Sequence, residues 1–295
     1  MTAGEIAPPT PKLTGPLTRR GPVDRWALLI LPGLAFLGVF YLVPVVQMAI
    51  RSLTDPSPSN YAVFFHHGYY RHVLWTTFKE AGIVTAATAL LGYPYAYLMH
   101  LAGRRAKIVL GAIVLIPLWS SLLVRTYAWT VLLQYTGVVN TVLHRLGLID
   151  QPLTLMRNTL GVTIGMTHVL LPIMVLPIFA AMRRVEPELT AAAMGLGARR
   201  AAAFRRVFFP LTLPGLLAGS LLVFVLALGY YITPALLGSP QNEMFSELIV
   251  QQFSTFLNFG VGSALAMILL AVTLLVVGVG SRIINVGRAV GYGSE

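Results

Sequence analysis

Two acidic residues four positions apart form the most informative charged pair in this sequence of 295 residues. Glu243 and Glu247 lie in the segment NEMFSELIVQQF, and they share one face if that segment is helical. Like charges at this spacing repel each other, so a cationic partner would stabilise both carboxylates. A diamine could supply that charge, but solvation or a basic residue of a partner protein is the simpler interpretation. The pair is a candidate for contact with a cationic solute.

Six further residues could face a solute, and each has an ordinary structural explanation as well. They are Glu80, Arg125, Tyr127, Trp129, Tyr230 and Tyr231. An ionisable side chain in an apolar segment is costly and therefore marks a candidate site, although Arg125 is more simply explained by reaching toward the membrane interface. Aromatic rings bind alkylammonium groups through their faces, but tyrosine and tryptophan are also common in interfacial belts. Lys79 and Glu80 are adjacent, point to different helix faces and are not expected to pair.

Motifs for catalysis, metal binding and nucleotide binding are missing from the sequence. The chain has no cysteine, and the spacing of His66, His67 and His72 matches no familiar metal site. There is no G-x-x-x-x-G-K-[ST] loop for ATP, no H-E-x-x-H and no G-x-S-x-G. The sequence therefore predicts no catalytic residue and no metal or cofactor bound by this chain.

Composition indicates a membrane protein that presents these residues on helices. Hydrophobic residues make up 56% of the chain and charged residues only 11%, less than half the charged share of a soluble domain. Apolar stretches of about 20 residues are long enough to cross a bilayer as helices. We expect an all-α polytopic membrane protein with six transmembrane helices, at about 27–50, 76–101, 108–133, 160–182, 211–232 and 261–284. Residues 1–24, rich in proline and threonine, are predicted to be a disordered tail before a permease domain at 25–288, and residues 289–295 a second tail.

The basic residues predict how these helices are oriented. Fifteen of the 21 Lys and Arg residues fall on one side of a six-helix arrangement: before the first segment, between the second and third, between the fourth and fifth, and at the end of the sixth. By the positive-inside rule this side is cytoplasmic, and both termini lie there. The net charge of +11 is thus a topology signal, and no nucleic-acid partner is expected.

The longest predicted cytoplasmic loop, residues 183–210, reads as two short helices. Pro187 suits a first helical turn, and Glu188 places negative charge at the positive end of the helix dipole. An alanine run follows, and Gly195 or Gly197 can adopt the left-handed conformation that ends a helix. A second helix over about 198–208 is expected to stop before Pro210. An alanine surface has little bulk, so it could fit a groove of a partner while nearby arginines meet carboxylates at its rim. The simpler interpretation of these residues alone is a solvated link whose arginines only set the topology.

This loop resembles the EAA loop of the permease subunits of ABC importers. Gly197 and Pro210 have the spacing of that pattern, with Ala192 and Ala193 as its two alanines. Ala191 stands where the family has glutamate, and Glu188, one turn earlier, is a candidate replacement. Phe209 stands where the family has leucine. The resemblance implies that the coupling loop to the ATPase comprises Glu188, Ala191, Ala192, Ala193, Gly197, Arg199, Arg200 and Pro210.

Other segments extend the resemblance over nearly the whole chain after residue 25. LLGYPYAY, PLWSSLLVRTYAW, GVVNTVLHRLGLI, FPLTLPG, YYITPALLGSP and NFGVGSALA are similar to the spermidine/putrescine branch of that family. The resemblance implies a type I permease in the inner membrane, which pairs with a second, similar permease, two cytoplasmic ATPase subunits that use ATP and Mg, and an extracytoplasmic solute-binding protein. The solute it favours is a polyamine. Opines, amino-acid derivatives and phosphonates are alternatives, and an uncoupled channel is a further one.

The resemblance also implies a mechanism. Closure of the ATPases would push the helix around 191–197 and turn the transmembrane helices from inward-facing to outward-facing. Within the membrane, Gly161 and Gly165 form a small-xxx-small pair that predicts close packing of the fourth transmembrane helix on another helix.

Overall fold

The computed structural model describes residues 27–55 and 58–291, with side chains for residues 30–55 and 58–282. The predicted tail at 1–24 lies outside the described residues. Residues 289–291, predicted to be part of a C-terminal tail, instead continue the last helix. Every regular element in the described part of the chain is a helix. The longer ones are α1 (Ala27–Thr54), α3 (Gly68–Leu101), α4 (Arg104–Leu115), α5 (Leu122–Leu133), α7 (Thr159–Met182), α10 (Phe209–Leu228), α12 (Phe245–Ser254) and α13 (Phe259–Gly291). The shorter ones are α2 (Asn60–His66), η1 (Ile116–Trp119), α6 (Val138–Arg145), α8 (Pro187–Gly195), α9 (Arg200–Ala203), η2 (Phe204–Phe208), α11 (Ile232–Leu237) and η3 (Pro240–Asn242).

The described part of the chain divides into two compact units, with the boundary between Gln47 and Met48. The described part of the first unit is most of helix α1, which is apolar along its length and contains Pro32 and Pro44. Phe36 and Phe40, one turn apart, have ring centroids separated by 4.4 Å. This helix contains the first predicted transmembrane segment.

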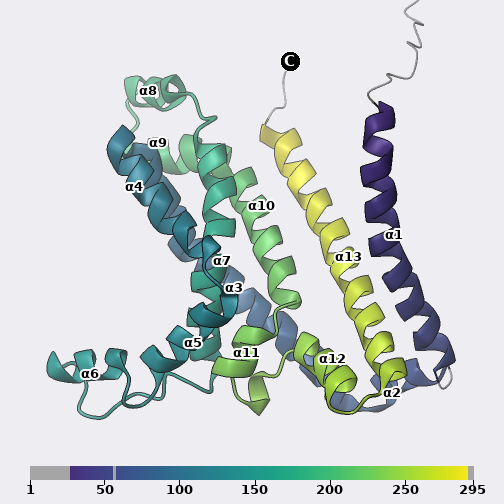
Figure 1. Ribbon diagram of the computed structural model, residues 1–295. Helices are drawn as coiled ribbons and strands as arrows, with labels where there is room; N and C mark the ends of the chain where they lie inside the picture. Colours follow the sequence, from purple (N-terminus) through teal and green to yellow (C-terminus); the bar gives the residue numbers. More distant parts are fainter. Residues whose placement is uncertain (1–26, 56–57, 292–295) are drawn as a thin grey trace, which may run out of the picture. The chain divides into compact units, whose positions relative to one another are not determined.

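The core of the second unit is a bundle of α3, α7 and α10 (Figure 1). Small residues bring α7 and α10 into close contact, since a Cβ on Gly215 would lie 2.4 Å from Ala181 Cβ and 2.7 Å from the Pro177 carbonyl oxygen. Methionines of α7 fill the remaining space: Met166, Met174 and Met182 are fully buried. Unbranched thioether side chains adapt to irregular gaps, which suits an interface crowded by proline and glycine backbones. Half of the residues in the most apolar 18-residue stretch of α7 are buried.

The third predicted transmembrane segment, 108–133, is not a single straight helix. It is divided into α4, the 3-10 turn η1 and α5, and the helical stretches on either side of the break are bent by 103°. Pro117 opens the 3-10 turn, and Ser120 and Ser121 then adopt extended backbone conformations. Apolar composition alone predicted a continuous helix here, whereas the proline and the two extended serines end one helix and start another in a new direction.

The other predicted segments correspond to helices, although their bounds shift. The second lies inside α3, which begins at Gly68. The fifth, predicted at 211–232, begins inside a helical stretch that runs from Arg200 to Leu228 and extends four residues past its end. Among the described residues, four helices are long and apolar enough to cross a membrane, or five if the bent pair is one span. Helix α3, which contains the second predicted segment, is not among these four. The predicted count of six is therefore not confirmed.

The second unit has two distinct ends in Figure 1. Helices α8 and α9, the start of α4 and the C-terminal end of α13 lie at one end, which we call the loop end. Helices α2, α6, α11 and α12 lie at the opposite end. The predicted cytoplasmic segments at 104–107 and 183–206 both fall at the loop end, so the tertiary arrangement groups the basic residues as the positive-inside rule anticipates.

Candidate coupling loop and solute path

The first loop helix, α8, has the predicted start and stop. Pro187 occupies the first turn, and Glu188 is its acidic residue. The helix ends at Gly195, and Gly197 has a φ of 91°, so Gly197 is the residue that takes the left-handed conformation. A residue with a Cβ is strained in that conformation, which explains the glycine. Ala191 and Ala192 are exposed, and Ala193 is partly covered.

The second loop helix does not end before Pro210, contrary to the prediction. Helix α9 passes into the π-helical turn η2 and then directly into α10, whose first turn contains Pro210. The Phe209 N–H bonds to the Phe204 carbonyl, five residues earlier. This wider turn lets the chain stay helical next to a proline that has no N–H to donate. The loop is consequently joined to the transmembrane helix by continuous helix.

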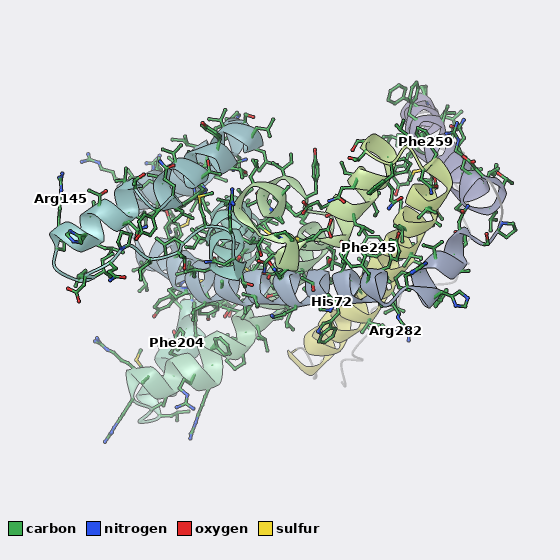
Figure 2. All side chains as sticks on the ribbon, turned by 90° about the horizontal axis from the view of Figure 1, so that it is seen from below. His72, Arg145, Phe204, Phe245, Phe259 and Arg282 are labelled. Carbon is green, nitrogen blue, oxygen red and sulfur yellow. The ribbon has the colours of Figure 1, made fainter. Side chains whose placement is uncertain are left out.

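Exposed arginines surround this junction. Arg199, Arg200, Arg205 and Arg206 are all exposed, and the described residues form no ion pair with them. Figure 2 shows nitrogen-tipped side chains projecting outward from the segment around Phe204. A cleft of about 360 Å³ is lined by Arg199, Arg205 and Arg206 together with two alanines. The loop therefore presents a basic surface with little side-chain bulk.

An aromatic cluster beneath the loop was not predicted from the sequence. Phe204 packs against Tyr97 at 5.2 Å between ring centroids and stacks on Phe208 at 5.7 Å. Tyr93 packs on Phe209 at 5.4 Å, and its hydroxyl is hydrogen-bonded to Thr212 Oγ1 at 2.8 Å. The cluster joins the loop to α3 and α10. Its sequence signal was the four-residue spacing of aromatic residues in both segments, 93 and 97, 204 and 208.

Glu80 is buried inside the second unit rather than lining a path. Its side chain is 1% exposed, and Oε1 accepts hydrogen bonds from Thr159 Oγ1 and Asn242 Nδ2, each at 2.8 Å. Oε2 has no hydrogen-bond partner among the residues that the structure describes. The neighbouring Lys79 is exposed, so the two point to different faces as predicted. Glu80 holds α3, the start of α7 and η3 together at the opposite end.

Glu243 and Glu247 do not share a helix face, because Glu243 precedes α12 by two residues. Glu243 is 9% exposed and accepts hydrogen bonds from the Tyr69 hydroxyl and from Gln251 Nε2, the latter at 2.6 Å. Burial raises the pKa of Tyr69 to about 12, with a further contribution from this hydrogen bond, so the phenol keeps its proton. Burial also raises the pKa of the half-buried Glu247, and the nearby Glu243 adds to the shift. Neither glutamate is paired with a basic side chain among the described residues.

Arg125 and Trp129 meet His168 of α7. Trp129 Nε1 donates to His168 Nδ1 at 3.2 Å, with the two rings 5.6 Å apart. The charge of Arg125 is close enough to act on both His168 and Tyr230. Nε and Nη1 of Arg125 are buried and have no hydrogen-bond partner in the part of the chain that the structure describes. These residues form a second polar site, separate from the two glutamates.

The other aromatic candidates are not gathered into a site. Tyr127 is 66% exposed on α5 and Tyr231 is 40% exposed. The glycine pair of α7 does provide close packing: a Cβ on Gly165 would lie 2.5 Å from Leu237 Cδ1 and 2.8 Å from Thr233 Cγ2. Its partner is the short helix α11 of the same chain, so the predicted helix contact is confirmed.

Comparison with known proteins identifies the family. Residues 90–285 match the family described as "Binding-protein-dependent transport system inner membrane component". The chain belongs to this family. It is 30% identical over 258 residues to the spermidine/putrescine transport system permease protein PotB of Haemophilus influenzae, covering 83% of this chain and 90% of that protein. It is 33% identical over 219 residues to PotB of Escherichia coli, covering 73% and 80%.

Solved structures support the same fold at lower identity. A permease chain of a bacterial ABC transporter that imports alginate superposes with a TM-score of 0.69 at 18% identity, over 88% of this chain and 95% of that one. A chain of the inward-facing methionine transporter MetNI gives 0.56 at 17% identity, over 73% and 94%. The expected all-α permease fold of a binding-protein-dependent ABC importer is thereby confirmed, and the chain is a transport component of the inner membrane.

Proposed function

We propose that this permease imports a polyamine of the spermidine/putrescine type, with solute delivered by an extracytoplasmic binding protein. The observation that carries the proposal is the identity of 30–33% to spermidine/putrescine permeases over most of both chains. Glu243 and Glu247, which have no basic partner among the described residues, support a cationic solute. Two anionic groups in partly desolvated positions gain stability from a nearby cation.

The complex that we propose contains this chain, a second homologous permease and two copies of a cytoplasmic ABC ATPase. The ATPases use ATP and Mg, and this chain binds no cofactor. Both termini lie in the cytoplasm together with the loop end, because that end carries the predicted cytoplasmic arginines.

Helix α8 is the element that we propose docks on the ATPase. It has no buried residue, and Leu196, just beyond it, is 91% exposed. Glu188 lies on this helix one turn before Ala191, where the family pattern has glutamate, and it takes over that contact. Closure of the ATPases moves α8, and the helix through η2 and the aromatic cluster pass the movement to α10 and α3.

A second solute class is favoured by Arg125. Its buried Nε and Nη1 have no hydrogen-bond partner among the described residues, and a half-buried guanidinium with two such nitrogens is well matched to a carboxylate or phosphonate group. Opine-like compounds, amino-acid derivatives and phosphonates carry such groups.

A binding and uptake experiment separates the two classes. The solute-binding protein that works with this permease is titrated with putrescine, spermidine, an opine and a phosphonate, and ATP-driven uptake of each compound is measured with the complete importer in proteoliposomes. We expect binding and uptake of polyamines only. Uptake of the anionic compounds without polyamine uptake would replace the proposal by the second class, and uptake without ATP would contradict the importer mechanism.

A further inference from the structure

A cleft of about 390 Å³ lies at the opposite end of the second unit, between the start of α3 and α12. Its walls include Tyr69, Tyr70, Leu248, Gln251, Gln252 and Phe256. Pockets for small ligands range over about 300–1,000 Å³, so this cleft suits a small solute or one end of a longer one. None of these lining residues was a candidate in the sequence, because their side chains come from segments far apart in the chain.

Glu243 decides which polar atoms Tyr69 and Gln251 offer to the cleft, which Gln252 and Asn258 also line. Oε2 of the Glu243 carboxylate accepts a hydrogen bond from the Tyr69 hydroxyl, and Oε1 accepts one from Nε2 of Gln251. Tyr69 therefore has only oxygen lone pairs left, and Gln251 has its amide oxygen free of that hydrogen bond. Since a carboxylate accepts and cannot donate, the orientation of the Gln251 amide is fixed with its nitrogen toward Glu243. The two side chains are thus held as hydrogen-bond acceptors on the cleft wall.

The negative charge near the cleft and the geometry of its aromatic rings both favour a cationic ligand. Glu243 and the half-buried Glu247 give this region negative charge, and no basic side chain among the described residues is ion-paired with them. The rings of Tyr69 and Tyr70 lie 5.8 Å apart at 73°, so they form two walls at a steep angle. Aromatic faces attract cations, and Phe256, 64% exposed, with Leu248 provides apolar surface for methylene groups.

We infer that this cleft binds a primary alkylammonium group, with Tyr69 and Gln251 as acceptors and Glu243 as the positioning residue behind them. A primary ammonium has N–H donors and no acceptor, which complements a wall of acceptors. The inference deepens the proposed function, because a polyamine carries such a group at each end. The cleft then binds one end of the polyamine at the face where the binding protein delivers it.

Direct binding of butylammonium tests the cleft independently of transport. Butylammonium chloride is titrated calorimetrically into the complete solubilised importer without its binding protein, for the wild type, Glu243→Gln and Tyr69→Phe. Loss of one charge-assisted interaction is expected to weaken binding about tenfold or more in each variant. Asp150→Asn and Tyr135→Phe, which change exposed residues of the same types outside the cleft, should bind like the wild type. Co-elution of the ATPase in size-exclusion chromatography shows that each variant is assembled.

The outcomes distinguish this inference from the proposed function. Butylammonium affinity that is unmeasurable in the wild type, or equal in the wild type and both cleft variants, overturns the inference. If the variants keep that affinity but lose the solute-binding protein, the cleft docks a protein and the inference is also overturned. A wild-type importer that binds butylammonium as predicted but does not take up putrescine refutes the polyamine proposal alone.

Discussion

Helices α7 and α8 follow each other in the chain but differ completely in packing. In the most apolar 18-residue stretch of α7, half of the residues are buried inside this protein, whereas none of the nine residues of α8 is buried. The contacts that stabilise α7 come from α3, α10 and α11, but Met194 near the end of α8 and Leu196 just beyond it remain exposed. Contacts within this chain therefore account for the packing of α7, whereas the exposed surface of α8 is the one that we propose docks on the ATPase.

Replacing Gly215 with leucine should lower stability more than the other two substitutions, because it disrupts the contact between α7 and α10 within this chain. The added Cβ would lie 2.4 Å from Ala181 Cβ and 2.7 Å from the Pro177 carbonyl oxygen. The clash can be relieved only by moving the backbone of α7, which is costly. We expect a loss of about 1–3 kcal/mol or more, seen as a lower thermal unfolding midpoint of the solubilised complex. Gly82→Leu is the matched control, since a Cβ on Gly82 meets nothing within 4 Å. Equal destabilisation by both would show that the α7–α10 contact is not the tight interface described above.

Gly197→Val tests the loop and should leave the folded core intact. Valine at a φ of 91° costs about 1–2 kcal/mol, so the docking conformation of α8 becomes roughly tenfold rarer. ATP-driven uptake in proteoliposomes should fall by about that factor, while the amount of assembled protein and its ATPase activity persist. Gly195→Val is the control, because Gly195 is helical and has open space around it. Unchanged uptake in Gly197→Val would count against the coupling role.

Tyr93→Phe should have the smallest effect, at the junction between the two regions. It removes the hydrogen bond to Thr212 Oγ1 and keeps the ring that packs on Phe209. A cost of about 0.5–1.5 kcal/mol in unfolding free energy is expected from denaturant titration. Tyr97→Phe is the comparison, since its ring packs on the same cluster but its hydroxyl makes no hydrogen bond to any described residue. If Tyr97→Phe costs as much, the hydroxyl contact between α3 and α10 contributes nothing specific.

Local sequence patterns correctly predicted most of the helices and the start and end of the loop helix α8. The start of α8 at Pro187 and the left-handed Gly197 depend on backbone constraints that belong to single residues, so they can be read without the fold. The backbone constraint of proline gave a wrong prediction at Pro210, because a π turn keeps the chain helical there. The break at residues 120–121 was missed for a related reason: apolar composition reports length but not a change of direction.

The solute-path candidates were less predictable, because their surroundings come from distant segments. The spacing of Glu243 and Glu247 suggested a shared helix face, yet the helix begins only at Phe245, and Glu243 is instead held by Tyr69 and Gln251. Glu80 appeared as an ionisable residue near a solute, but its partners are Thr159 and Asn242 in the interior.

The sequence by itself determined an apolar, helical, membrane-embedded chain with its basic residues grouped and one alanine-rich loop helix, because these properties depend on composition and local backbone preference. Only the tertiary structure decided which carboxylates are buried, which aromatic rings join the loop to the bundle, and where two tyrosines and a glutamine form a cleft. Those outcomes depend on contacts between residues more than a hundred positions apart, such as Tyr69 and Glu243, and no local pattern encodes such a distance.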